Sequence, residues 1–280
     1  MKIKGAFSVK MKCFLNLTVG VALAGMFFLL TACGGSEGKL ICGVTQYEPM
    51  NYLDSNGNWT GFDTEFALLV GEKLNMEIEF QEIDWGRKFI ELEAGSINCI
   101  WNGLTANVVD SVTGRQRYED VDFSYSYMRN QQRVVIRTDR AGEFNSESDL
   151  IGKTVACEAG SAGETFASDA VGETGTVIGS TAQINAFVEV KSGAVDFAIV
   201  DILLAERMTG AGDYTDLMIA DIYLPYEVFA IGFPIGSDLT GKVNDAITEL
   251  YNEGKLVELA QKYGLENSLE IDTSDIRSRN

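Results

Sequence analysis

The chain of 280 residues contains no histidine and few basic residues for its number of acidic ones. Without histidine, Ser-His-Asp and Cys-His nucleophile activation, HExxH zinc sites and most structural zinc clusters are excluded. The 22 Lys and Arg against 41 Asp and Glu give a net charge of −19. This balance argues against a nucleic-acid partner, because nothing would neutralise a run of phosphates. Paired carboxylates, Lys and Tyr remain open as catalytic groups.

Cysteines are also few, and no CxxC pair indicates redox or metal chemistry. Cys42, Cys99 and Cys157 each lie in an apolar, strand-like run, and their number is odd. We therefore expect buried free thiols rather than a disulfide framework. No cofactor and no metal site is predicted.

The first 32 residues have the features of an export signal. Lysines at positions 2, 4, 10 and 12 precede an apolar run from Phe14 to Leu30. The run ends in "LTACGG" (30–35), which resembles a bacterial lipobox, in which the Cys becomes the lipidated first residue. We predict a signal peptide over 1–32, acylation (palmitate) at Cys33 and a flexible tether over 33–39. An ordinary signal peptide or an N-terminal membrane helix is the alternative.

Strand-like and helix-like patterns alternate from residue 40 onward. Runs at 40–45, 78–83 and 97–101 predict strands, and 62–74 and a short segment around Phe89 predict helices. The alternation restarts after residue 150, with strands expected at 153–158, 175–180 and 194–201 and helices at 164–171 and 181–193. This order predicts an α/β fold with two lobes, each a mainly parallel sheet flanked by helices.

Two segments connect the predicted lobes. Residues 133–138 carry the chain into the second lobe and 228–234 carry it back, so lobe 1 covers 40–132 and 228–265 and lobe 2 covers 133–227. A helix over 242–263 completes lobe 1, and 266–280 is expected to be a polar, frayed tail. Two crossings make a hinge, and ligands of open parallel sheets bind at the carboxyl ends of strands. The cleft between the lobes is the expected site.

Four segments follow strand ends at this cleft. They are the loop with Tyr47, the turn Asn102-Gly103-Leu104-Thr105, the small-residue turn 159–164, and Asp201, which ends the apolar run "VDFAIVD". Small residues and a helix N-terminus at the third segment favour an anionic group, and the lack of Gly-Lys-Ser/Thr argues against a nucleotide P-loop. Asp201 either binds a cation that is not part of the chain or caps the helix that begins at Ile202.

Several motifs along the chain, taken in their order, resemble those of a known family. "GFDTEFA", "DW" (84–85), "NGLT", "VDFSYSY", "DLIGKTVACEAGSAGE" and "GAVDFAIVD" resemble the polar amino-acid binding proteins of ABC importers, solute-binding family three, over nearly all of residues 40–263. The resemblance implies a periplasmic-binding-protein-like fold and a lipid-anchored, extracytoplasmic receptor. Such a receptor captures a free amino acid between its lobes and presents it to an importer permease, without covalent chemistry. We expect a monomer.

The resemblance also implies roles at matching positions. Arg117 and the turn of Ser161 and Ala162 hold the ligand α-carboxylate, and Asp201 takes the α-ammonium. Gly103 and Thr105 contact the ammonium and the carboxylate, while Tyr47 stacks on the side chain with Trp85 nearby. The predicted ligand-binding residues are Tyr47, Trp85, Asn102, Gly103, Thr105, Arg117, Glu158, Ser161, Ala162 and Asp201.

Several alternatives stay open. The spacer 106–116 is longer than the family's usual one, so Arg115 competes with Arg117, and Arg117 has the alternative of a surface ion pair with Glu119 or Asp120. Glu158 either favours a cationic or amide ligand side chain or is a solvated residue at a strand end.

Two other function classes also remain. One is a dehydratase-type enzyme that uses Glu158 or Asp201 as a general acid, which requires a raised pKa. The other is a ligand sensor acting through a partner, although the chain shows no output domain. The combination of Arg117 and Asp201 favours binding of a zwitterion, because an acid catalyst should not be neutralised by an ammonium.

Overall fold

A computed structural model of the protein describes residues 38–279. The predicted signal peptide, Cys33 and most of the predicted tether lie outside the described residues. Within residues 38–279, no helix combines the length and the apolar character needed to cross a bilayer.

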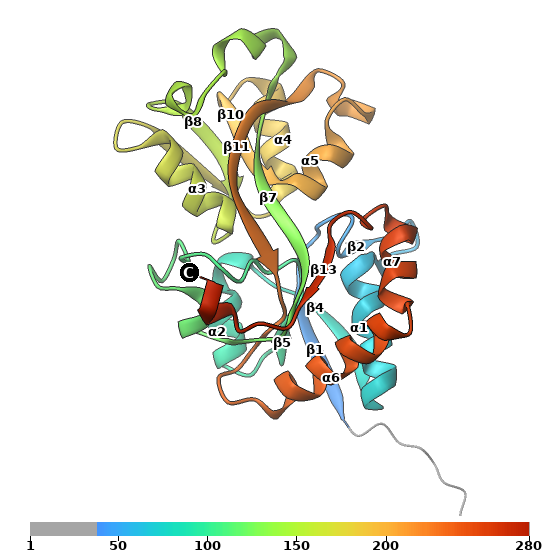
Figure 1. Ribbon diagram of the computed structural model, residues 1–280. Helices are drawn as coiled ribbons and strands as arrows, with labels where there is room; N and C mark the ends of the chain where they lie inside the picture. Colours follow the sequence, from blue (N-terminus) through green and yellow to red (C-terminus); the bar gives the residue numbers. More distant parts are fainter. Residues whose placement is uncertain (1–37, 280) are drawn as a thin grey trace, which may run out of the picture. The chain divides into compact units, whose positions relative to one another are not determined.

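The first lobe is built on a five-stranded sheet with the order β4-β1-β5-β12-β6. β1 is parallel to β4 and β5, whereas β12 is antiparallel to β5 and β6. Helices flank this sheet, and a small hairpin of β2 and β3 lies beside it (Figure 1). The elements are β1 (Lys39–Val44), β2 (Tyr52–Leu53), β3 (Trp59–Thr60), α1 (Phe62–Leu74), β4 (Glu77–Glu82), α2 (Lys88–Glu93), β5 (Cys99–Ile100), β6 (Asp122–Phe123), β12 (Gly232–Phe233), α6 (Asp238–Asn252) and α7 (Lys255–Tyr263).

The second lobe is built on a six-stranded sheet, in which five strands follow the order β11-β7-β10-β8-β9 and the sixth, β13, pairs with β7. β8 is parallel to β9 and β10, and β7 is antiparallel to β10 and β11. Its elements are β7 (Ser126–Arg137), β8 (Thr154–Glu158), α3 (Ala162–Val171), β9 (Thr176–Ser180), α4 (Gln183–Ser192), β10 (Phe197–Asp201), α5 (Ile202–Met208), β11 (Leu217–Phe229) and β13 (Leu269–Asp272). Short 3-10 helices are η1 (Trp85–Arg87), η2 (Arg117–Glu119), η3 (Thr138–Glu143), η4 (Glu147–Leu150), η5 (Gly212–Tyr214) and η6 (Ile276–Arg279).

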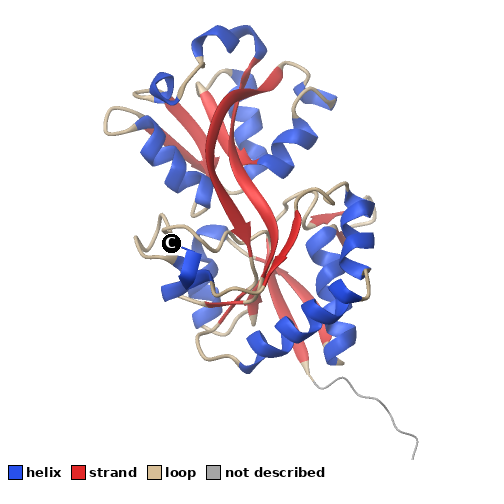
Figure 2. Ribbon diagram, viewed as in Figure 1, coloured by secondary structure: helices blue, strands red, loops and turns tan. Residues whose placement is uncertain are grey.

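The apolar patterns explain both kinds of element. In α1, Phe62, Phe66 and Val70 recur every four residues and are all buried, as a helix packed on one face requires. All five residues of β10 are buried, which is typical of a strand covered on both faces of its sheet. The predicted two-lobed α/β fold, with sheets flanked by helices (Figure 2), is therefore confirmed.

Two long antiparallel strands, β7 and β11, connect the lobes (Figure 1). β7 follows β6 of the first sheet and enters the second, and β11 leaves the second sheet and leads into β12 of the first. The predicted crossings at 133–138 and 228–234 overlap these strands, which are much longer than the sequence suggested.

Two predictions about the C-terminal part are wrong. Residues 242–263 belong to two helices, because Gly254 adopts a left-handed φ of 75° between α6 and α7. Residues 266–279 are not frayed: β13 pairs with β7 at Met128 and Ser126, and Ile276 is buried. A few apolar side chains in this polar segment are enough to pack it against the rest of the protein.

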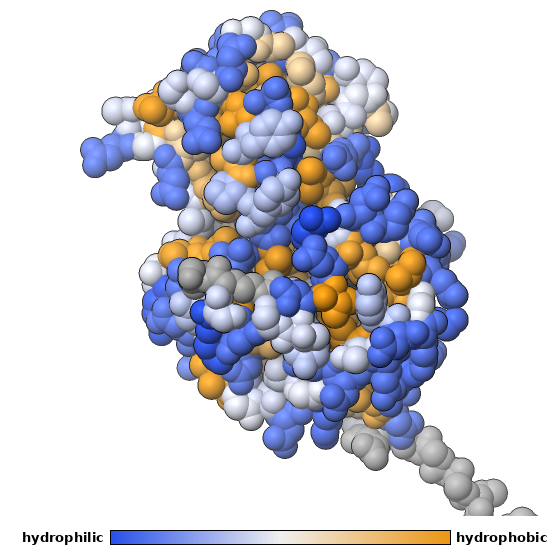
Figure 3. Space-filling model, in the orientation of Figure 1, coloured by the Kyte–Doolittle hydropathy of each residue, from blue (hydrophilic) through white to orange (hydrophobic). Residues whose placement is uncertain are grey.

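Hydrophilic residues cover most of the surface in the view of Figure 3, with hydrophobic patches on each lobe. This agrees with the acidic composition. Cys42, Cys99 and Cys157 are buried free thiols, as predicted.

Candidate functional site

All ten predicted ligand-binding residues line one cavity at the junction of the two lobes, together with Gln132 and Gln183. The cavity volume is about 10 Å³, roughly the room that one water molecule needs. Any larger ligand therefore requires the lobes to move apart or the lining side chains to rearrange.

In the first lobe, Asp63 fixes the turn that follows β5. Its carboxylate accepts the Gly103 N–H at 2.7 Å and the Tyr127 hydroxyl at 2.9 Å, and burial raises the pKa of Asp63 to about 7. Gly103 has a φ of 57°, and a Cβ there would lie 2.8 Å from the Tyr47 ring, so only glycine fits. Thr45 donates to the Asn102 side chain at 2.6 Å and so anchors the start of the same turn.

Arg117 lies buried in the cavity wall, 1% exposed. Its Nε donates to Asp110 Oδ2 at 3.2 Å, Nη1 to the Thr105 carbonyl at 2.9 Å and Nη2 to the Gly160 carbonyl at 3.1 Å. Three of the five guanidinium N–H groups are engaged in this way, which leaves two for a ligand carboxylate. Arg115 instead pairs with Asp120 and is exposed, so the structure selects Arg117 for the cavity.

The long spacer 106–116 supplies the counter-ion of Arg117. It folds back on itself through the Val109–Gln116 bridge and buries Asp110 completely. Asp110 Oδ2 also accepts from the buried Lys88 Nζ at 3.1 Å. Burial raises the pKa of Asp110, but the charges of Lys88 and Arg117 outweigh it and hold that pKa below its usual value. The surface ion pair considered for Arg117 is therefore wrong.

In the second lobe, Ser161 caps α3 by accepting the Glu164 N–H at 3.2 Å, and Ala162 is the first residue of that helix. The helix N-terminus therefore faces the cavity, where it favours an anionic group. Glu158 ends β8 and is buried rather than solvated, which corrects one of the two expectations for it. Burial, and then the charge of Asp201, raise the pKa of Glu158 to about 8.

Asp201 is buried at the end of β10. Its Oδ1 accepts from the amides of Asn130 and Gln132, the latter at 2.6 Å, and its Oδ2 accepts from Gln183. It occupies the N-cap position of α5, yet its side chain accepts no hydrogen bond from that helix, so the capping interpretation is wrong. Within residues 38–279 no ion pair involves Asp201, and the side-chain amides of Asn130, Gln132 and Gln183 orient its carboxylate.

Direct contacts hold the lobes together around the cavity. The Gly160 carbonyl of lobe 2 accepts from Lys88 at 2.8 Å as well as from Arg117. Ser111 donates to Glu164 at 2.7 Å, and Thr165 donates to the Val109 carbonyl at 3.0 Å. The long spacer thus also reaches across the lobe junction.

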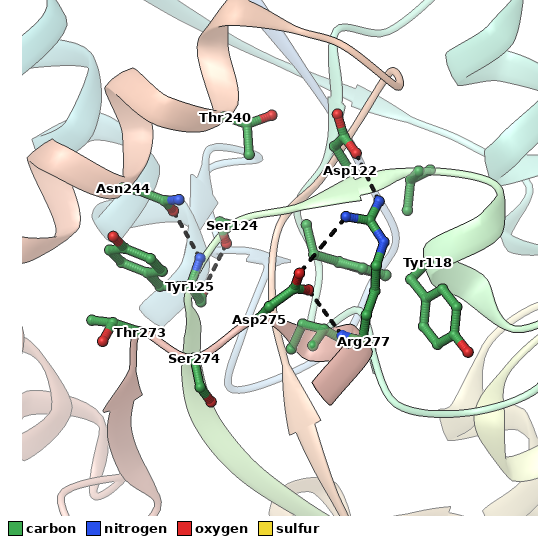
Figure 4. Close-up of a pocket in the computed structure, with 13 residues that line it drawn as sticks. Tyr118, Asp122, Ser124, Tyr125, Thr240, Asn244, Thr273, Ser274, Asp275 and Arg277 are labelled. Carbon is green, nitrogen blue, oxygen red and sulfur yellow. Dashed lines mark hydrogen bonds and ion pairs between the residues drawn. The ribbon is translucent and has the colours of Figure 1, made fainter. Parts of the chain in front are cut away.

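A second, larger cavity of about 280 Å³ lies away from these residues (Figure 4). β6, α6 and the C-terminal segment line it, and its one cation, Arg277, pairs with Asp122 at 3.3 Å and with Asp275. None of the ten predicted residues lies there. Residues 38–279 hold no cluster of three or more potential metal-ligating side chains.

The sequence did not predict several polar residues around the cavity: Asp63, Lys88, Asp110, Asn130, Gln132, Gln183 and Glu227. Gln183 was detectable, because it begins a helix directly after the strand β9 and so reaches the same edge as the other strand ends. Trp101, which ends the predicted strand 97–101, lies in the core against Phe66.

Two α/β lobes joined by two strands, with a buried polar cavity between them, define a two-lobed binding protein. Residues 40–266 match the family of bacterial extracellular solute-binding proteins, family 3, and the chain belongs to this family. The resemblance predicted from the sequence is confirmed, and so is an extracytoplasmic location.

Individual relatives are similar along most of the chain. The arginine-binding extracellular protein ArtP of Bacillus subtilis is 32% identical over 263 residues, which cover 90% of this chain and 98% of the relative. A histidine-bound ABC uptake transporter substrate binding protein from Streptococcus pneumoniae has 29% identity and a TM-score of 0.72, over 84% of this chain and 96% of that one. The ancestral amino acid-binding protein AncCDT-1, a precursor of cyclohexadienyl dehydratase, has 25% identity and a TM-score of 0.71, over 81% and 95%.

Proposed function

We propose that the protein is the substrate-binding component of an amino-acid ABC importer and that it binds a free amino acid between its lobes. One observation carries this proposal: side chains from both lobes, among them Arg117 and Asp201, converge on one buried cavity. A ligand that contacts both lobes is fully bonded only when they close, so binding and closure are coupled.

The two poles of the site suit a zwitterion. Arg117 and the N-terminus of α3 supply donors for an α-carboxylate, and a charge-assisted bond of this kind contributes about 1.5–3 kcal/mol. Asp201, oriented by its amide donors, supplies the fixed anion that a desolvated α-ammonium needs.

We further propose that the bound amino acid has a cationic side chain. Glu158 is a third ionisable group on the cavity wall, and a cation beside it would offset its burial. Buried acidic groups also outnumber buried cations around the site, with Asp63, Asp110, Glu158, Asp201 and Glu227 against Lys88 and Arg117. Burial raises the pKa of Glu158 and of Glu227 to about 8, and a ligand cation nearby would favour their ionised forms. The arginine-binding relative supports this choice.

The direct test is calorimetric titration of the protein without its lipid anchor against the twenty amino acids. At least one amino acid should bind, and Asp201→Asn should weaken it by about 2–5 kcal/mol, or roughly thirty- to several-thousand-fold in Kd. Asp139→Asn, an exposed aspartate in the same lobe, serves as the control. A folded Asp201→Asn protein with the wild-type Kd would refute the assignment of the ammonium pole.

An enzymatic role is the second candidate, because the pKa of Glu158 is raised to about 8, which would leave a protonated acid in the cavity at neutral pH. The likeness to a dehydratase precursor points the same way. Turnover of prephenate-like acids, lost in Glu158→Gln, would support it; amino-acid binding without turnover favours the receptor.

We also propose attachment to the membrane through acylated Cys33, from the lipobox-like motif at residues 30–35. Cys33→Ser should move the protein from the membrane to the soluble fraction. Continued membrane association of this variant would contradict the lipid anchor.

A further inference from the structure

The ion pair between Arg117 and Asp110 raises a question about the carboxylate pole. Both side chains are buried, and in low dielectric a one-to-one pair cancels most of the field that a ligand carboxylate would feel. Lys88 changes this balance, because its Nζ lies 3.1 Å from the same Asp110 oxygen that Arg117 contacts at 3.2 Å. Two cations therefore share one anion.

Lys88 is itself enclosed. It is 1% exposed, its Nζ lies over the rings of Trp85 and Phe89, and it also donates to the Trp85 carbonyl at 3.4 Å. Its remaining partner is the Gly160 carbonyl of the opposite lobe, at 2.8 Å. Lys88 is not on the cavity wall, so it acts through Arg117 and through the lobe contact.

We propose that Lys88 is a positioning residue that makes the site selective for ligands with a carboxylate. By sharing Asp110, Lys88 leaves the Lys88–Asp110–Arg117 cluster with one net positive charge next to the two free N–H groups of Arg117. A ligand carboxylate brings the cluster to neutrality, and the bond from Lys88 to Gly160 links this charge to the closed arrangement of the lobes. This inference rests on the proposed function and adds a determinant of ligand class to it.

The surroundings of Lys88 define a pH dependence. The charged groups that face it are Asp110 from the long spacer, Arg117 from η2 and Glu158 from β8; the rings of Trp85 and Phe89 cover it otherwise. Burial, and then repulsion by Arg117, lower the pKa of Lys88 to about 8. Its charge, and the carboxylate selectivity that depends on it, should be present below pH 8 and fade as pH rises through that value.

The experiment compares an amino acid with its decarboxylated amine, which isolates the carboxylate. With L-arginine and agmatine as probes, wild-type protein should bind L-arginine more tightly at pH 7. In Lys88→Met the ratio of the Kd for agmatine to the Kd for L-arginine should fall roughly ten- to hundredfold, as expected for losing one unit charge roughly 6–12 Å away at an effective dielectric constant near 20. Lys73→Met, which removes a lysine paired on the surface of the same lobe, should leave the ratio unchanged.

Asp110→Asn is a second variant, for which the opposite change is expected. It removes the shared anion and leaves two cations, so the Kd for agmatine divided by the Kd for L-arginine should increase. A folded Lys88→Met protein with the wild-type ratio would overturn the inference while leaving the proposed function intact. An equal or lower ratio in Asp110→Asn would also count against it. Wild-type protein that binds no amino acid would instead refute the proposed function itself.

Discussion

Gly160 offers a sharp test of lobe closure. Its φ is 72°, and a Cβ at this position would lie 2.6 Å from the Gly86 Cα of the opposite lobe, a backbone atom that cannot turn aside. Gly160→Ala therefore has two separable costs. The left-handed backbone costs about 1–2 kcal/mol of folding free energy whether the lobes are open or closed. The steric contact acts only when they close.

The cost of closure can be worked out from the contacts of Gly160. Relieving a 2.6 Å contact requires the lobes to stay further apart at this point, which stretches the bonds of its carbonyl to Lys88 (2.8 Å) and Arg117 (3.1 Å). Loss of one such charge-assisted bond costs about 1.5–3 kcal/mol, which is roughly ten- to 150-fold in Kd. Loss of both would cost more.

The measurement is a calorimetric Kd for the bound amino acid, with urea unfolding to record stability. The control is Gly210→Ala, because Gly210 has nearly the same φ of 73° and no atom within 4 Å of its would-be Cβ. Both variants should lose similar folding stability, and only Gly160→Ala should lose affinity. Equal affinities for the two variants would show that the lobes do not approach at Gly160 when ligand is bound.

Two further predictions concern single contacts. Asp63→Asn should flatten the pH dependence of the unfolding free energy: the pKa of Asp63 is raised to about 7 in the folded protein, so this group favours folding below about pH 4 and loses that contribution as pH rises to 7. Urea unfolding at pH 4.5 and 7.5 measures this, and an unchanged slope would mean that Asp63 does not titrate there. Ser111→Ala removes the hydrogen bond from the long spacer to Glu164 in the opposite lobe and should raise the ligand dissociation rate several-fold, since such a bond contributes about 0.5–1.5 kcal/mol. Stopped-flow dissociation checks this, and an unchanged rate would show that the contact does not form in the complex.

Much of the fold could be predicted from local pattern. The period of Phe62, Phe66 and Val70 gave α1 within its observed bounds, and the apolar run before Asp201 gave β10. The rule that ligands bind at the carboxyl ends of parallel strands also predicted that residues more than a hundred positions apart, such as Tyr47 and Asp201, line one site.

The missed residues depend on contacts that no local pattern contains. Lys88 and Asp110 are charged residues, and a charged residue is predicted to be exposed; both are buried because they pair with each other, with Arg117 as a second partner of Asp110. The prediction of a frayed C-terminal segment was wrong for a related reason. Its pairing joins β13 to Met128 and Ser126 of β7, more than a hundred positions away, which the segment's own pattern does not contain.

That C-terminal segment has a practical consequence for work on the isolated domain. The family match ends at residue 266, whereas β13 lies beyond it. β10 pairs with β7 at residues 132–135, and β13 pairs with β7 earlier along the strand, at Ser126 and Met128. A fragment trimmed to the family boundary would leave this part of β7 as an open strand edge, which invites edge-to-edge aggregation. Expression should therefore retain residues 267–279.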